Sequence, residues 1–174
     1  RFIVALNMLL AVIVTTVHAE TEYVSTPKYF EVTLSEISQA QESIEAWMYI
    51  IQADEREKDS QPRKLVDALI EAKKRGVEVQ VVLEQSLDIK DEFSESDVLA
   101  QPNQSAYELL KAGGVEVYFD SPGNKTHAKV IVIDQETTII GSSNWSKAAL
   151  TRNFEANALI KDKAFAEEVL KDLV

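Results

Sequence analysis

A histidine and a lysine lie two positions apart in the second half of the chain, in the segment His127-Ala128-Lys129-Val130-Ile131-Val132-Ile133-Asp134. The apolar run after Lys129 is typical of a buried strand. Because side chains alternate along a strand, His127 and Lys129 should project together at its beginning. An imidazole titrates near neutral pH and can act as a nucleophile or a general acid. An ammonium beside it can hold a phosphoryl oxygen, so the pair predicts phosphate chemistry.

A second polar element follows the next apolar run. Residues 138–140 read as a short strand, and this strand leads into Gly141-Ser142-Ser143-Asn144. A hydroxyl and an amide in one turn could converge on the anion that Lys129 holds. Fixed donors of this kind stabilise the charge that develops on transferring phosphorus.

Taken together, these residues resemble a known signature. The pattern His127-x-Lys129-x4-Asp134-x6-Gly141-Ser142-x-Asn144 resembles the HKD motif of the phospholipase D superfamily. The downstream Asn153-Phe154-Glu155 is similar to the Asn-x-Glu of its bacterial endonuclease branch. The order of strand, basic-ended helix and strand before the motif also fits, so the resemblance runs from about Tyr23 to the C-terminus.

The resemblance implies a role for each matched residue. His127 would attack phosphorus and form a phosphohistidine that water resolves, while Lys129 and Asn144 hold the phosphoryl oxygens. Ser142 would assist them, and Glu155 would orient or polarise a histidine. Asp134 and Gly141 would be structural, with Asp134 fixing the turn at the far end of the strand. The family requires no metal and no cofactor.

One histidine cannot serve as nucleophile and as leaving-group acid in the same step. Because His18 falls in a predicted leader, His127 is the only histidine of the mature domain, and the chain has no cysteine. These counts exclude a multi-histidine metal site and thiolate chemistry within one chain. The resemblance implies two paired motifs, so we expect a symmetric homodimer with a composite site. The alternative is that this chain is one half of a longer protein with two motifs.

The first residues form a separate segment. Residues 2–17 are almost wholly apolar, and Val17-His18-Ala19 precedes the polar Glu20. This pattern predicts a secretory signal peptide over residues 1–19, or a short uncleaved anchor, followed by a catalytic domain over 20–174. We expect an exported or membrane-tethered protein. The chain begins with Arg1 and ends inside a predicted helix, so we also expect it to be a piece of a longer sequence.

The remaining chain alternates between helical and strand patterns. Helices are predicted at 29–43, 62–75, 103–112 and 163–174, and strands at 44–51, 77–83, 115–119, 129–133, 138–140 and 153–160. This alternation predicts an α/β fold in which a mixed, largely parallel sheet is sandwiched between helices, as in phospholipase D-like proteins.

The charge distribution leaves the substrate open. The formal net charge is −11, which opposes binding to a phosphate backbone. However, residues 121–152 carry four basic side chains against two acidic ones, around the predicted site. This favours an exported nuclease. An acidic stretch over 84–101 and the apolar leader instead favour a phospholipase or phosphatidyltransferase acting on membrane lipid. A non-catalytic scaffold is the third reading, which the intact His127, Lys129 and Asn144 oppose.

Overall fold

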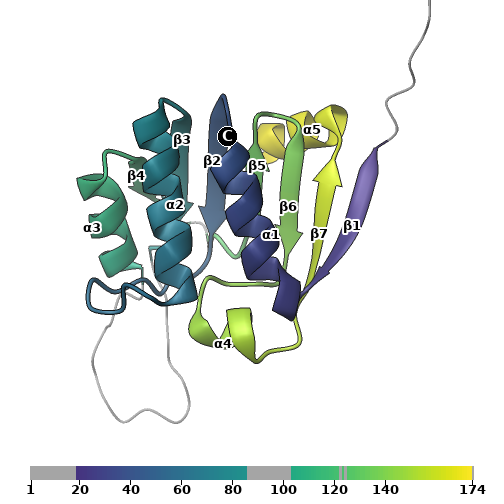
Figure 1. The fold of residues 1–174 in the computed structure, drawn as a ribbon. Coiled ribbons are helices and arrows are strands. Elements are labelled where there is room, and N and C mark those ends of the chain that lie inside the picture. Colours follow the sequence, from purple (N-terminus) through teal and green to yellow (C-terminus); the bar gives the residue numbers. More distant parts are fainter. Residues whose placement is uncertain (1–18, 86–102, 122, 124, 174) are drawn as a thin grey trace, which may run out of the picture.

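The computed structural model describes residues 19–85, 103–121, 123 and 125–173. Within these residues, helices cover both faces of one seven-stranded sheet (Figure 1). The strands lie in the order β1-β7-β6-β5-β2-β3-β4. The elements along the chain are β1 (Glu20–Ser25), α1 (Thr26–Gln39), β2 (Ser43–Met48), α2 (Gln61–Arg75), β3 (Glu78–Leu83), α3 (Gln104–Ala112), β4 (Glu116–Phe119), β5 (Lys129–Ile133), β6 (Thr137–Gly141), α4 (Lys147–Thr151), β7 (Ala156–Lys161) and α5 (Lys163–Leu173).

The sheet is mixed, as predicted, but it is not largely parallel. In the described part, only β2–β3 and β3–β4 are parallel, while β1–β7, β7–β6, β6–β5 and β5–β2 are antiparallel. The reason lies in the connections. Helix α2 connects β2 to β3 and helix α3 lies between β3 and β4, so that these strands run in the same direction. A tight turn at Asp134 and Gln135, both with positive φ, instead reverses the chain between β5 and β6.

The two faces of the sheet bury different apolar sets. Ile131 and Ile133 of β5 belong to the main core, which α1 and α2 help to cover. Val130 and Val132 point to the other face, where Val169 and neighbouring residues of α5 pack against them. This alternation confirms that Lys129 shares a face with Ile131, as the two-residue period predicts.

Local signals set the limits of α2. The Ser60 hydroxyl accepts a hydrogen bond from the Arg63 amide, and Pro62 lies in the first turn. The helix ends at Gly76, whose φ of 98° suits glycine. These caps set where α2 begins and ends in the connection from β2 to β3. The parallel crossover that α2 makes brings the carboxyl ends of β2 and β3 to the edge where β5 begins.

Most predicted elements are confirmed with shifts of a few residues at their ends, and two elements were missed. The sequence analysis did not predict β1, which pairs with β7 along its whole length, nor the short helix α4. Most of the predicted acidic stretch and the predicted leader lie outside the described residues. None of the described helices is long and apolar enough to cross a membrane.

Asp134 holds the connection between α1 and β2. Its carboxylate accepts the backbone N–H groups of Gln41, Glu42 and Ser43 at 2.7 to 3.1 Å. The sequence predicts that Asp134 fixes its own turn. The described hydrogen bonds of its side chain instead reach across to the loop that precedes β2, and the Asp134 amide donates to the Ser43 carbonyl.

Replacing Asp134 should therefore weaken the fold without changing the chemistry. We expect Asp134→Ala to lower the free energy of unfolding by about 2 kcal/mol, because several backbone donors lose a charged acceptor. Asp134→Asn keeps one acceptor oxygen and tolerates the positive φ, so it should lose less. Urea denaturation gives the values, and Gln135→Ala reports the cost of alanine at positive φ alone. Equal midpoints for Asp134→Ala and Gln135→Ala would contradict this role.

Candidate active site

The start of β5 places His127 and Lys129 side by side. The Lys129 ammonium donates to the His127 carbonyl at 2.7 Å, and Nζ lies 3.3 Å from Nδ1 of the same histidine. Lys129 is only 8% exposed, whereas the His127 side chain is exposed. A buried cation thus lies against an accessible imidazole, as the sequence predicts.

The environment keeps His127 in its neutral form. Partial burial lowers the pKa of His127, and the positive charges of Lys129 and Lys125 lower it further, while the carboxylate of Glu84 opposes them. An imidazole with a lowered pKa carries a free nitrogen lone pair at neutral pH, which a nucleophile requires. Burial also lowers the pKa of Lys129, and the negative charge of Glu155 opposes that shift.

Tyr49 is a site residue that the sequence analysis missed. It follows β2, where its amide donates to the Ala128 carbonyl at 2.9 Å. Its ring lies 4.4 Å from the His127 ring, centre to centre, and 4.7 Å from the Lys129 ammonium. The aromatic ring therefore supports both functional side chains. Only the antiparallel register of β2 and β5 brings Tyr49 here, and the sequence contains no signal for that register.

The turn after β6 lies at the same edge of the sheet. Val130 pairs with Ile140, so Gly141 and the residues after it lie beside the start of β5. Gly141 has a clear steric reason to be glycine, because a Cβ there would collide with the Asn157 side chain and the Ala156 carbonyl. Asn157, which the sequence analysis did not single out, accepts the Ser143 amide and donates to the Ser143 hydroxyl. This buried amide fixes the turn.

Ser142, Asn144 and Glu155 have different surroundings. The Ser142 hydroxyl donates to Glu155 and accepts the Ala156 amide, so its proton is already used. Glu155 also accepts a hydrogen bond from Asn153. Its described contacts are thus with Ser142 and Asn153, and its charge acts on Lys129; the orientation of a histidine by Glu155 stays a prediction. The buried Oδ1 atom of Asn144 has no hydrogen-bond partner among the described residues, which suits a group kept for a ligand.

Trp145 lies beneath this turn. It is fully buried, its indole nitrogen donates to the Tyr29 hydroxyl at 3.3 Å, and its backbone bonds to Ile50 and Gln52. Trp145 therefore packs under the turn as part of the main core. Its bridge to Ile51 joins the turn to the segment that follows Tyr49.

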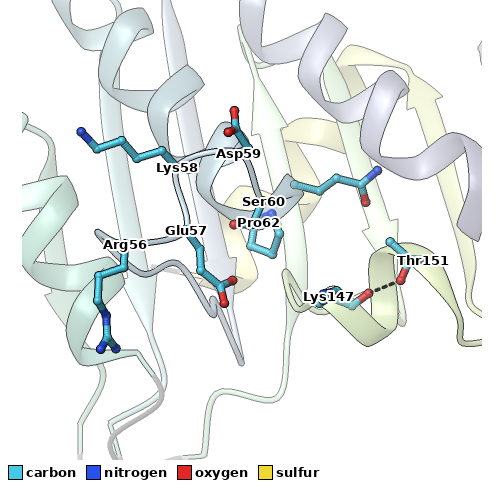
Figure 2. A pocket seen from close by; sticks show the side chains of 9 residues that line it. Arg56, Glu57, Lys58, Asp59, Ser60, Pro62, Lys147 and Thr151 are labelled. Carbon is cyan, nitrogen blue, oxygen red and sulfur yellow. Dashed lines mark hydrogen bonds between the residues drawn. The ribbon is translucent and has the colours of Figure 1, made fainter.

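Two pockets lie near this edge of the sheet. An apolar pocket of about 340 Å³ adjoins His127 and Lys129 and is lined by Ala128, Val130, Ile140, Gly141, Val169, Asp172 and Leu173. A larger one, of about 740 Å³, lies between the loop before α2 and the helix α4 (Figure 2). Lys147 lines this second pocket, and Arg56 and Lys58 extend away from Lys147. The basic residues of 121–152 are thus divided: Lys125 and Lys129 contact Tyr49 beside His127, whereas Lys147 lines the other pocket.

Comparison with curated proteins finds relatives whose names refer to lipid enzymes. The chain is 37% identical over 108 residues to a protein named Phospholipase D from Rickettsia typhi, and this alignment covers 62% of the chain and 47% of that protein. It is 34% identical over 95 residues to Cardiolipin synthase A from Pseudomonas entomophila, covering 55% of the chain and 18% of that protein. The chain thus spans about half the length of the Rickettsia protein, and much less of the synthase.

Solved structures resemble the chain over nearly its whole length. Nuc from Salmonella typhimurium, described as a phospholipase D family member, has a TM-score of 0.70 at 26% identity, and the match covers 89% of this chain and 91% of that one. NucT from Helicobacter pylori shares the fold, with a TM-score of 0.66 at 20% identity, covering 88% and 92%. The family described as cardiolipin synthase, PLD-like domain, matches residues 33–173. Since this match spans most of the chain and includes His127, Lys129 and the turn after β6, the chain belongs to the phospholipase D-like family.

Proposed function

We propose that this domain is a metal-independent phosphodiesterase that works through a phosphohistidine. The observation that carries this proposal is the contact between an accessible imidazole of lowered pKa and a buried ammonium, His127 and Lys129. The imidazole supplies the nucleophile, and the ammonium holds a phosphoryl oxygen as negative charge develops on it. Asn144, with its unpartnered buried oxygen, supplies a second polar contact at the same turn.

The reaction needs two imidazoles. A ring nitrogen of His127 forms a bond to phosphorus, and the phosphorus–oxygen bond to the leaving alkoxide breaks. A second, protonated imidazole gives its proton to that alkoxide. In the second step the same imidazole, now neutral, takes a proton from water, whose oxygen attacks phosphorus and releases His127. Residues 19–85, 103–121 and 125–173 contain no histidine besides His127.

The second imidazole must therefore come from outside the described residues. In our proposal it comes from a second copy of the chain, related by a two-fold axis, whose own His127 completes the site. A second motif within a longer protein is the alternative, since the chain spans about half of the Rickettsia phospholipase D. Sedimentation of the full chain separates the two. A stable monomer without activity would exclude the homodimer.

Two substrate classes fit this site. A nucleic acid is our first choice, because Nuc and NucT match the chain over nearly their whole length and because Lys125 and Lys129 lie beside His127. A phospholipid is the second choice. The apolar pocket beside His127, lined by Val130, Ile140 and Leu173, could take part of an acyl chain. The relatives named Phospholipase D and Cardiolipin synthase A add weight to this choice.

One experiment separates these substrates. The full chain, in the presence of a chelator, is incubated with single-stranded DNA and, separately, with phosphatidylcholine vesicles. His127→Asn accompanies it in both reactions. DNA cleavage that the variant lacks supports a nuclease, and lipid turnover alone supports the phospholipase. Activity that the chelator abolishes would contradict the proposed metal-independent mechanism for both substrates.

The place of action is also part of the proposal. An exported protein, periplasmic or secreted, or one tethered by an uncleaved segment, follows from the apolar run over residues 2–17. Mass spectrometry of the protein from the cell envelope and the medium would show whether cleavage occurs after Ala19.

A further inference from the structure

Two carboxyl groups beside His127 have no part in the chemistry proposed above. Glu84 and Asp120 are each the first residue after a strand, β3 and β4, and these strands run parallel with Leu83 paired to Phe119. Their side chains therefore lie together at the edge of the sheet where β5 begins. Glu84 is only 1% exposed. A carboxyl group so deeply buried is costly, and its presence calls for an explanation.

Both carboxyl groups hold the same backbone amide. The Thr126 N–H lies 2.5 Å from Oε2 of Glu84 and 3.0 Å from Oδ2 of Asp120. Asp120 also accepts the Gln85 amide at 2.8 Å and the Thr126 hydroxyl. We call this arrangement of the Glu84 and Asp120 carboxyl groups around the Thr126 amide the carboxyl bracket. Because Thr126 immediately precedes His127, the bracket fixes the peptide from which the imidazole projects.

The two carboxyl groups also bond to each other. The Asp120 and Glu84 side chains lie within hydrogen-bonding reach of each other, and this contact helps to lower the pKa of Asp120. Although burial raises it, hydrogen bonds from Thr126 and the Gln85 amide hold the pKa of Asp120 below its usual range.

A buried amide ties this bracket to the other side of the site. Asn103 is 1% exposed, and its Nδ2 atom donates to the carbonyls of Glu84 and Tyr49, each at 2.9 Å. Its Oδ1 atom accepts the Ile51 amide at 2.8 Å. Tyr49 in turn packs against the ring of His127. One network therefore joins the ends of β2, β3 and β4 to the residues that precede β5.

We propose that Glu84 and Asp120 are positioning residues for the phosphodiester reaction, which hold His127 in place through the Thr126 amide. The inference rests on the proposed function of His127. A fold that needed only an acceptor for one amide could use a backbone carbonyl. The buried Glu84 carboxylate also places a negative charge near an imidazole that faces Lys125, Lys129 and the Tyr49 ring.

The effect of the Glu84 charge on the pKa of His127 can be measured without a substrate. The Glu84 carboxylate raises the pKa of His127 against the effects of burial, Lys129 and Lys125. Glu84→Gln keeps an acceptor for Thr126 and an N–H donor for Asp120, but it removes a carboxyl group. The pKa of His127 should then fall in this variant. Imidazole resonances of the full chain follow this titration by NMR, and the signal of His127 is the one that disappears in His127→Asn.

Kinetics complete the test. With Glu84→Gln, kcat at neutral pH should stay within about threefold of the parent, and the acid limb of kcat/KM should move to lower pH. With Glu84→Ala, which leaves the Thr126 amide with Asp120 alone, we expect kcat to fall about 10- to 100-fold with little change in KM, because the nucleophile is misplaced. The matched control is Glu78→Gln, an exposed glutamate at the opposite end of β3, which should match the parent in every measurement.

Each outcome decides the matter. Unchanged titration of His127 in Glu84→Gln would overturn the inference, and so would a Glu84→Ala enzyme with parental kcat. If kcat is as low in Glu84→Gln as it is in Glu84→Ala, the inference is also overturned. If the titration shifts as expected while the parent cleaves neither DNA nor lipid, the bracket is supported and the proposed function fails.

Discussion

His127→Asn should abolish turnover on whichever phosphodiester the parent cleaves. We expect kcat to fall by about 10⁴- to 10⁶-fold, because one substitution removes both the nucleophile and, in a two-fold symmetric site, the leaving-group acid. The fold should be unaffected, since the His127 side chain is exposed and asparagine fits its place. Rapid acid quenching of the parent with labelled substrate should trap phosphorus on the protein, and the variant should carry none.

Mixtures of parent and variant test whether the site is composite. If each site draws one His127 from each of two chains, only dimers with two parental chains are active. An equal mixture, unfolded and refolded together, should then keep about one quarter of the parental activity at the same total concentration. Activity of about one half would show that each chain works alone. That result would contradict the shared site.

Lys129→Met should have the second largest effect. Lys129 is buried against His127 and is the nearest positive charge for a phosphoryl oxygen, so its loss should lower kcat by about 10²- to 10³-fold. The positive charge of Lys129 lowers the pKa of His127, so its removal should raise that pKa. The limb of the pH–rate profile that reports the neutral nucleophile should therefore move to higher pH.

Lys125→Met is the matched control for this prediction. Lys125 is exposed, lies 5.7 Å from the centre of the Tyr49 ring and also lowers the pKa of His127. Its removal should shift the pH profile in the same direction as Lys129→Met, with a much smaller loss of kcat. A Lys129→Met enzyme with the parental profile would show that Lys129 does not act on the imidazole.

Several features of the site were predictable from the sequence because they depend on local spacing. A two-residue period is enough to place Lys129 on the same side as Ile131, and the structure confirms this. The hairpin between β5 and β6 also has a local cause, since its turn residues take positive φ. These features follow from neighbours a few residues apart, for which the chain itself carries the signal.

Other features depend on contacts between distant segments. No local pattern connects Asp134 with the loop before β2, about 90 residues earlier, yet its carboxylate accepts hydrogen bonds from three amides there. The side chain of Glu155 accepts hydrogen bonds from Ser142 and Asn153, and its orientation of a histidine stays a prediction. Strand register, which no local pattern encodes, decides such partnerships.

The amino-acid sequence by itself determined which chemistry is available: one histidine within residues 20–174, one lysine two residues away and a Gly-Ser-x-Asn turn at a fixed distance. The tertiary structure decided which groups surround that chemistry. Tyr49 and Glu84 reach His127 only because β2, β3 and β5 meet at one edge of the sheet. The physical reason is that hydrogen-bonded pairing of strands remote in sequence fixes positions that helical or strand periodicity cannot.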